Sequence, residues 1–561
     1  MIELELARLV RGAVERLAGE QGFEIPEIPE IEVTRPRQKE HGDYATNVAL
    51  VIGSLTGRNP REVAEALARH LPTSDLLVKV EVAGPGFINF TVGHAWLYRV
   101  LGEIERLGAA YGRSGDEPPE RVLVEFVSAN PTGPLHVGSG RNAAVGDSLA
   151  RVLEAVGHTV EREYYVNDAG TQAMLFGASI EVRYLERFGR AGEIPEGGYQ
   201  GEYIAELAEA IAADLGEALL DASDEERRAR LAEEGMRRAL ASIRATLERM
   251  DVRIDRWLHE SSLHAEGRID EAVERLRQAD LAYDADGAVW FRSTRFGDEK
   301  DRVLIRATGD PTYFAADCAY LLDKFGRGYD RLLYIWGADH HGVVKRLQGV
   351  AEAFGYDLER AEFILYQLVH LRRGSEPVRM SRRRGEIITL DELLDEVGPD
   401  AARYTLLTRS TDTAIDFDIA LVKSRSLENP VYYVQYAHAR IASLIRYAAE
   451  QGTTMVPFED VDPKELVHET ELDLLRKLAD LPEQLRVAAA LRAPYRLTKY
   501  AEELAADFHR FYTECRVVTE DAPLTQARLH LAGGTKQVIG NVLDLLGVSA
   551  PESMDRLEDE G

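Results

Sequence analysis

Three short stretches of the chain hold residues whose types and spacing could do chemistry. The first, "PTGPLHVGSGRN" (131–142), places His136 among glycines. An imidazole N–H can donate to a phosphate oxygen, and glycines allow close backbone approach. The second, "GADHHG" (337–342), offers Asp339 to a ribose hydroxyl. The third, "RRGSEPVRMSRRR" (372–384), holds six arginines and one acidic residue, which could neutralise a triphosphate. Together they point to a nucleotide.

Each stretch also has a plainer interpretation. Glycine-rich turns between a strand and a helix often bind nothing, so the first stretch alone leaves a nucleotide site and an ordinary turn equally open. His340 and His341 could ligate a metal, but no third ligand is close in sequence, and this is the weaker interpretation. An arginine run is often a solvated face, yet 372–384 is typical of a loop. Thr389 and Glu392 predict a capping box, and therefore a helix, after it.

Two strand–loop–helix units would position the first two stretches. Residues 122–127 form an apolar strand, and from Arg141 onward apolar residues recur at helical spacing. Residues 332–336 and 343–354 repeat this order around the second stretch. Each loop would bring free backbone N–H groups and the positive end of a helix dipole to one point, which suits an anion. This order is typical of a parallel α/β sheet.

The chain is too long for one hydrophobic core, and its pattern changes along its length. A polar stretch at 111–122 separates a first unit from the α/β region, which a helix-rich segment interrupts. After about residue 425 the pattern is almost entirely helical. The predicted domains are an N-terminal domain at 1–110, a catalytic domain at 118–425 with a helical insertion at about 175–280, and a helical domain at 426–561.

Composition restricts the classes of partner. The chain of 561 residues has a formal net charge of −29, which argues against indiscriminate binding to nucleic acid or anionic membranes. No apolar run approaches the length of a membrane span, so we expect a cytoplasmic protein that binds neither DNA nor membrane. The two cysteines, Cys318 and Cys515, are far apart in apolar surroundings. We expect reduced core thiols and no protein-bound zinc.

The motifs resemble those of one enzyme family. "PLHVGSGRN" resembles the HIGH signature of class I aminoacyl-tRNA synthetases, and "VRMSRR" resembles their KMSKS loop. The surrounding text, including "VEFVSANPTGPLHVG", "REYYVNDAGTQ", "TYFAADCAYLLDKF" and "ENPVYYVQYAHARI", is similar to the arginyl-tRNA synthetases. The resemblance runs from about residue 35 to the end. It implies a Rossmann-type doubly wound parallel-sheet catalytic domain with an α+β N-terminal domain and an all-α C-terminal domain.

The resemblance also implies roles for individual residues. Those that would bind ATP are Pro134, His136, Gly138, Ser139, Gly337, Asp339, His340 and Met380. The catalytic residues would be His136, Gly138 and Ser139, with Arg379, Met380, Ser381 and Arg382 forming the loop that stabilises the transition state. Those that would line the arginine pocket are Glu125, Asn130, Tyr313, Asp317 and His341. Candidate tRNA contacts are Phe87, Asn89, Arg383, Arg384 and Tyr436.

The implied reaction joins ATP and L-arginine into arginyl adenylate with release of pyrophosphate, and then transfers the arginyl group to the 3′ end of tRNA(Arg). Mg²⁺ would accompany the ATP. The resemblance further implies that arginine activation can require bound tRNA. We expect a monomer. The carboxylates implied for the arginine pocket suit this substrate, because a carboxylate can accept two parallel hydrogen bonds from a planar guanidinium and a lysine ammonium group cannot provide that geometry.

The signatures depart from the family pattern at three positions. Ser139 replaces the second histidine of HIGH, and Arg379 and Arg382 replace the lysines of KMSKS. The chain has only ten lysines among 67 basic residues, so a general preference for arginine explains the loop, and we predict an active site. Two alternatives stay open: a non-catalytic RNA-binding relative, which would not need Asp317, and a nucleotidylyltransferase, which would not need the helical C-terminal domain.

Overall fold

The computed structural model describes residues 2–19, 23, 25–36, 38–74, 76–115, 118–378 and 388–554. The chain forms two compact units. The first unit comprises Met1–Gly112, Ala437–Gln484 and Glu503–Asn541. The second unit comprises Arg113–Tyr436, Leu485–Glu502 and Val542–Gly561.

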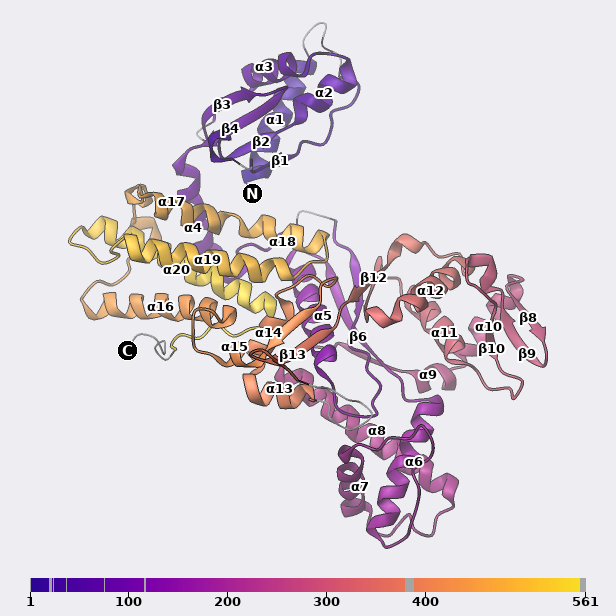
Figure 1. Cartoon of the computed structure of the whole chain (residues 1–561). Helices are drawn as coiled ribbons and strands as arrows, with labels where there is room; N and C mark the ends of the chain where they lie inside the picture. Colours follow the sequence, from indigo (N-terminus) through magenta and orange to yellow (C-terminus); the bar gives the residue numbers. More distant parts are fainter. Residues whose placement is uncertain are drawn as a thin grey trace. The chain divides into compact units, whose positions relative to one another are not determined.

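A parallel five-stranded sheet organises the second unit (Figure 1). Its order is β12-β11-β5-β6-β7, and all four pairings are parallel. The strands are β5 (Arg121–Glu125), β6 (Thr159–Val166), β7 (Arg256–His259), β11 (Arg331–Gly337) and β12 (Ala361–Tyr366). The chain runs outward from β5 to β7 and then returns to β11 on the other side of β5. A ligand-binding crevice forms at such a reversal, at the carboxyl ends of the strands. The predicted doubly wound sheet is confirmed.

The helix that follows β5 begins earlier than predicted. α5 spans Val137–Ala155 and is capped by His136, whereas the sequence analysis began the helix at Arg141. Gly138 and Gly140 therefore lie in its first turn and not in a loop. Glycine has low helix propensity, which explains the error. The helix after β11, α12 (His341–Ala353), likewise begins two residues before its predicted start at 343.

The insertion between β6 and β7 is a small helical lobe. It contains α6 (Gly170–Arg187), α7 (Glu202–Leu215) and α8 (Asp224–Arg249), drawn together in Figure 1. The lobe has its own core, in which Phe176, Ile180, Ile204 and Leu231 are fully buried. Strand β7 lies inside the segment predicted to be helical, because four residues are too few to show a strand period.

The rest of the second unit surrounds the sheet with smaller elements. α9 (Glu260–Ala265), α10 (Arg268–Gln278) and α11 (Tyr313–Gly326) accompany an antiparallel sheet of β8 (Ala282–Ala285), β9 (Ala288–Phe291) and β10 (Arg302–Ile305). These strands do not join the parallel sheet, contrary to the expectation that the α/β pattern resumes there. A last sheet and three helices follow: β13 (Val369–Arg373), β14 (Glu376–Pro377), α13 (Leu390–Val397), α14 (Pro399–Leu407), β15 (Ile415–Asp418) and α15 (Ile419–Lys423).

The first unit begins with an antiparallel sheet and ends in helices. The sheet has the order β1-β2-β4-β3. The elements of this N-terminal part of the unit, helices included, are α1 (Ile2–Ala18), β1 (Val33–Thr34), β2 (Tyr44–Thr46), α2 (Val48–Thr56), α3 (Pro60–His70), β3 (Leu77–Ala83), β4 (Phe87–Val92) and α4 (His94–Leu107). The C-terminal region contains α16 (Pro430–Glu450), α17 (Glu469–Ala479), α18 (Leu481–Ala490), α19 (Tyr495–Glu514) and α20 (Ala522–Leu546). The predicted helical character of this region is confirmed.

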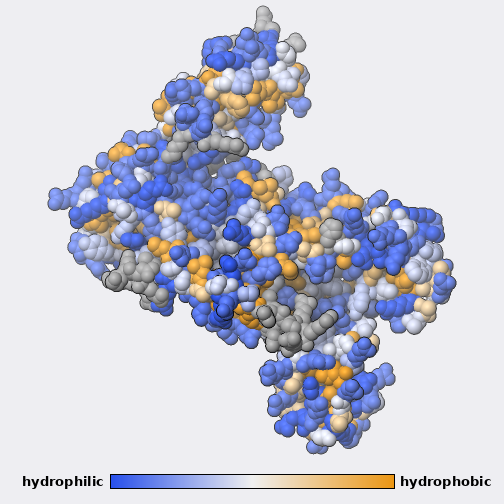
Figure 2. All heavy atoms as spheres, in the orientation of Figure 1, coloured by the Kyte–Doolittle hydropathy of each residue, from blue (hydrophilic) through white to orange (hydrophobic). Residues whose placement is uncertain are grey.

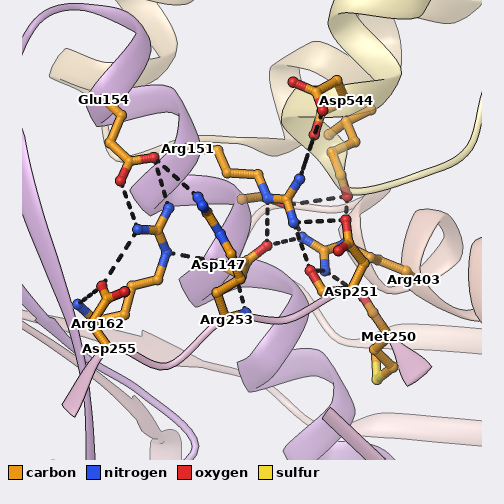
Figure 3. Close-up of polar contacts among 12 residues, drawn as sticks. Asp147, Arg151, Glu154, Arg162, Met250, Asp251, Arg253, Asp255, Arg403 and Asp544 are labelled. Carbon is orange, nitrogen blue, oxygen red and sulfur yellow. Dashed lines mark hydrogen bonds and ion pairs between the residues drawn. The ribbon is translucent and has the colours of Figure 1, made fainter. Parts of the chain in front are cut away.

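A buried ion cluster fixes α5 within the second unit (Figure 3). The carboxylate of Asp147, fully buried, accepts from Arg403 and, at 2.7 Å, from Arg151. Arg162 lies 3.5 Å from the same carboxylate. Arg403 also donates to the carbonyl of Leu546 at 2.5 Å. A buried charge is tolerated only when it is paired, so this cluster locks α5 to neighbouring segments.

The surface and the cysteines agree with an ordinary globular protein. Figure 2 shows hydrophilic residues over most of the visible face, with apolar residues in scattered patches. No described helix is long and apolar enough to span a bilayer. Cys318 and Cys515 are buried and free, as predicted.

Candidate active site

His136 caps the helix that follows the central strand. Its Nδ1 accepts from the backbone N–H of Ser139 at 3.2 Å, so a neutral ring carries its proton on Nε2 and can donate from there. A Cβ at Gly138 would lie 3.0 Å from His136 Cε1, so a side chain there would require the imidazole to shift by a few tenths of an ångström. An imidazole beside the positive end of a helix dipole is an arrangement that suits an anion.

Ser139, which stands at the position of the second histidine of HIGH, is largely buried. Ser139 is only 6% exposed, so little of it is available to a ligand. Gly140 faces α13, where a Cβ would lie 2.7 Å from Leu390 Cδ1. Leu390 also donates its N–H to the carbonyl of Leu135 at 2.7 Å. Leu390, a few residues after the arginine-rich stretch, is thereby hydrogen-bonded to Leu135, the residue before His136.

The arginine-rich loop is described only at its ends. Val378 donates to the carbonyl of Leu371 at 2.9 Å, and the predicted capping box of Thr389 and Glu392 is confirmed before α13. The predicted loop residues Arg379, Met380, Ser381, Arg382, Arg383 and Arg384 lie outside the described residues.

The turn after β5 is strained at two residues. Val127 has a φ of 66° and Ser128 a φ of 41°, a conformation that is rare for β-branched residues and costs about 1–3 kcal/mol each. Asn142 of α5 accepts from the N–H of Val127 and donates to the carbonyl of Ile335, both at 2.9 Å. It thus bridges the ends of β5 and β11 at the crevice. The sequence analysis did not single out Asn142.

A second unpredicted residue, Arg141, joins α5 to the segments after β12. Its guanidinium is fully buried and donates to the carbonyls of Gln367 at 2.6 Å, Ser410 at 2.8 Å and Thr413 at 2.9 Å. Burial lowers the pKa of Arg141 to about 10. Three carbonyl acceptors compensate the charge, and its place directly after the capping turn adds positive potential behind His136.

The predicted adenosine residues lie at the carboxyl end of β11. Asp339 and His340 are exposed, with 85% and 54% of their side chains accessible. A Cβ at Gly337 would lie 2.5 Å from Asp339 Oδ1, so the carboxylate folds back over the glycine. Pro134 is exposed on the facing loop. His341 is the first residue of α12. Among the described residues no three His, Cys, Asp or Glu side chains gather as metal ligands.

Three carboxylates, Glu125, Glu260 and Asp317, are near enough for the charges of the two glutamates to act on Asp317, and we term this set the acidic pocket. Burial and the charges of Glu260 and Glu125 raise the pKa of Asp317 to about 7, against a smaller opposing effect of Arg346. Burial also raises the pKa of Glu260, although Tyr165 donates to it at 2.9 Å. Carboxylates that disfavour each other's charge are stabilised by a cation. Glu260, at the start of α9, was not predicted because it is remote in sequence from the other two.

Tyr313 and Asn130, two more residues predicted for the arginine pocket, lie against the start of α6. Tyr313 begins α11, is 41% exposed, and lies with its ring 3.4 Å from where a Cβ at Gly170 would be. The side-chain amide of Asn130 donates to Gln172. Tyr313 and Asp317 are one helical turn apart, as predicted, and Tyr313 and Asn130 each lie against the first turn of α6.

The predicted tRNA contacts differ in exposure. Phe87, the first residue of β4, is 40% exposed, whereas Asn89 is 7% exposed and offers little surface to a partner. Tyr436 lies on α16 and stacks on Tyr432 with ring centroids 5.9 Å apart. Phe87 is therefore the better placed of the two β4 candidates.

Family models cover most of the chain. The model described as tRNA synthetases class I (R), catalytic domain, matches residues 110–419. The arginyl tRNA synthetase N terminal domain matches residues 4–92, and the DALR anticodon binding domain matches residues 434–554. The doubly wound sheet with its capped α5 is therefore the catalytic domain of a class I tRNA synthetase.

Whole-chain relatives narrow the class. The arginine–tRNA ligase of Heliobacterium modesticaldum is 47% identical over 99% of both chains, and that of Desulforudis audaxviator is 48% identical over 98% of both. The solved arginyl-tRNA synthetase of Thermus thermophilus shares the fold, with a TM-score of 0.76 at 24% identity over 99% of this chain and all of that one. The chain belongs to the arginyl-tRNA synthetase family, and the predicted resemblance is confirmed.

Proposed function

We propose that this protein is an arginine–tRNA ligase that activates L-arginine with ATP and transfers the arginyl group to the 3′ end of tRNA(Arg). The acidic pocket is the observation that carries the proposal. Glu125, Glu260 and Asp317 form a partly buried set of like charges, and an amino acid with a guanidinium and an α-ammonium group supplies the cations that such a set requires.

ATP would bind across the crevice between β5 and β11. The capping end of α5, with His136, Gly138 and Ser139, would take the phosphates. Gly337, Asp339 and His340, with Pro134, would surround the adenosine. Arg379, Met380, Ser381 and Arg382 would close over the triphosphate. ATP would enter with Mg²⁺, which is held mainly by phosphates and water.

The chemical step in this proposal is a displacement at the α-phosphorus of ATP. The arginine carboxylate attacks, pyrophosphate leaves, and a ribose hydroxyl of tRNA then displaces AMP from the adenylate. Glu125, Asn130, Tyr313, Asp317 and His341 would hold arginine while this occurs. No covalent enzyme intermediate is needed, because positioning and charge stabilisation supply the rate.

The rest of the proposal concerns tRNA and assembly. The predicted domains at 1–110 and 426–561 would meet tRNA(Arg), with Phe87, Asn89, Arg383, Arg384 and Tyr436 as candidate contacts. We also propose that the protein is a monomer. A role in translation places the protein in the cytoplasm.

Arginine-dependent exchange of pyrophosphate into ATP tests the activity. We expect exchange when tRNA(Arg) is present, and arginylation of that tRNA in a separate assay. Running both assays with lysine and citrulline in place of arginine checks the charge and shape of the pocket. Tight tRNA binding without exchange under any condition would instead identify a non-catalytic RNA-binding relative.

We expect the KM for arginine to fall as pH rises from 6 to 8. Asp317, with a pKa of about 7 in the empty site, gains its charge over this interval, and a bound cation favours the charged form. Binding therefore releases a proton, and the change should approach about tenfold. Steady-state exchange across this pH range measures it. Burial, Glu260, Glu125 and Arg346 set the pKa of Asp317 and so the midpoint of the profile, and Asp317→Asn should flatten it.

A further inference from the structure

α11 presents to the acidic pocket a row of residues that extends beyond the predicted pair. Tyr313, Asp317, Tyr320 and Lys324 recur at intervals of four, three and four residues, so they share one face of the helix. Lys324 is fully buried. A buried ammonium group is costly unless it is paired, so the residue that Lys324 pairs with indicates the role of Lys324.

The partner of Lys324 is a carboxylate proposed to hold arginine. Its Nζ donates to Glu125 Oε2, while the nearest oxygen of Glu163 lies 4.0 Å away. The ammonium also sits over two aromatic rings, with Nζ 4.1 Å from the centroid of Tyr320 and 3.9 Å from that of Tyr334. Electron-rich ring faces stabilise a cation. Burial lowers the pKa of Lys324, and the charges of Glu125 and Glu163 oppose this effect.

Glu163, the other carboxylate near Lys324, has partners of its own. Arg327 donates to it with two nitrogens at 2.6 and 3.0 Å, and the hydroxyl of Tyr320 donates at 2.6 Å. Arg327 thus compensates Glu163, which leaves Lys324 to compensate Glu125. Each carboxylate thus has a different nearest cation, although the charge of Lys324 also acts on Glu163 and lowers its pKa.

Lys324 and Ser128 together fix the orientation of the Glu125 carboxylate. The second oxygen of Glu125 accepts from Ser128 Oγ at 3.0 Å, and Ser128 belongs to the strained turn after β5. Each carboxylate oxygen of Glu125 therefore accepts one hydrogen bond, Oε2 from the buried Lys324 and Oε1 from Ser128 in the strained turn. Glu125 is 3% exposed, so arginine would reach it only through a remaining lone pair of one of these oxygens.

We propose that Lys324 is a positioning residue of the arginine site, which holds Glu125 in place and offsets one of the three carboxylate charges of the acidic pocket. The proposal rests on the proposed function. Without Lys324, Glu125 would be a buried carboxylate without the ammonium group that now pairs with it, and an unpaired buried charge is costly. The pocket would lose both a charge and a fixed acceptor for arginine.

The test is Lys324→Met in pyrophosphate exchange with tRNA(Arg) present. We expect the KM for arginine to rise on the order of tenfold, while the KM for ATP stays within about twofold, because the phosphate site on α5 does not contact Lys324. Thermal unfolding by circular dichroism identifies loss of fold. Lys324→Gln, which keeps a donor but not the charge, is the second variant and should have an intermediate KM.

Arg327→Gln is the matched control. It removes a cation from the same neighbourhood but one that touches Glu163 instead of Glu125, so the KM for arginine should stay near the wild-type value. A double-mutant cycle with Glu125→Gln provides the sharper test. If Lys324 acts through Glu125, adding Lys324→Met to Glu125→Gln should change the KM for arginine no further.

Three outcomes would overturn the proposal. They are an unchanged KM for arginine in folded Lys324→Met, an equal rise in Arg327→Gln, or additive effects in the cycle. If the wild-type protein itself gives no arginine-dependent exchange, the proposed function fails instead. Normal wild-type exchange with a normal Lys324→Met variant refutes only the role of Lys324.

Discussion

Replacing Asp317 by asparagine is expected to lower kcat/KM for arginine by 10²–10³-fold, roughly the effect of removing one partner of a desolvated charge pair. The asparagine would keep the volume but lose the negative charge, and its amide N–H₂ would face the guanidinium donors instead of accepting from them. The loss should appear mainly in the KM for arginine, and the KM for ATP should change little. Pyrophosphate exchange over a range of arginine concentrations measures both.

The same variant should not lose stability. The folded protein holds the pKa of Asp317 well above its usual value. Above the unfolded pKa, the ionised carboxylate therefore opposes folding, and asparagine removes that cost at neutral pH. The melting temperature should stay equal or rise. Asp323→Asn is the control on the same helix, because Asp323 pairs with Arg327 at 3.0 Å. Wild-type arginine kinetics in Asp317→Asn would show that the pocket does not bind arginine.

Replacing His136 by alanine is expected to lower kcat by 10²–10³-fold, roughly the cost of losing one donor aimed at developing charge. The imidazole donates from Nε2 because its Nδ1 is engaged by the N–H of Ser139. Alanine removes that donor and also the helix cap, which costs about 1 kcal/mol of stability. Exchange kinetics and thermal unfolding measure the two losses separately.

His136→Asn separates the donor from the cap. Asparagine is among the best N-cap residues, so this variant should recover the stability that His136→Ala loses while kcat stays low. A kcat within tenfold of wild type in both variants would remove His136 from the phosphate site.

The local signals in the sequence were sufficient for the central part of the fold. Apolar spacing predicted the strand at 122–127 and the one at 332–336, and these are the two strands that flank the crevice. The start of α5 was not predictable from propensity, because Gly138 and Gly140 disfavour a helix. They are tolerated there since His136 and Leu390 occupy the space that a Cβ would need.

The parts of the site that were missed come from distant segments. Glu260 joins Glu125 only because the helical lobe returns the chain to the sheet at β7, and no local pattern marks that return. Lys324 did carry a signal, since it extends the spacing of Tyr313 and Asp317 along one helix face. Asn142 and Arg141 act through backbone carbonyls far along the chain, which a sequence alone does not pair.

The ion cluster around Asp147 has a consequence for the order of events during synthesis. One acceptor of the Arg403 guanidinium is the carbonyl of Leu546, a residue synthesised 143 positions later. Domains generally fold as their residues emerge from the ribosome, but here the second unit waits for Val542 and the residues after it. A nascent chain that stops before this point leaves the Arg403 guanidinium without one of its acceptors, the carbonyl of Leu546. Such a product would be a target for proteolysis and not a partly active enzyme.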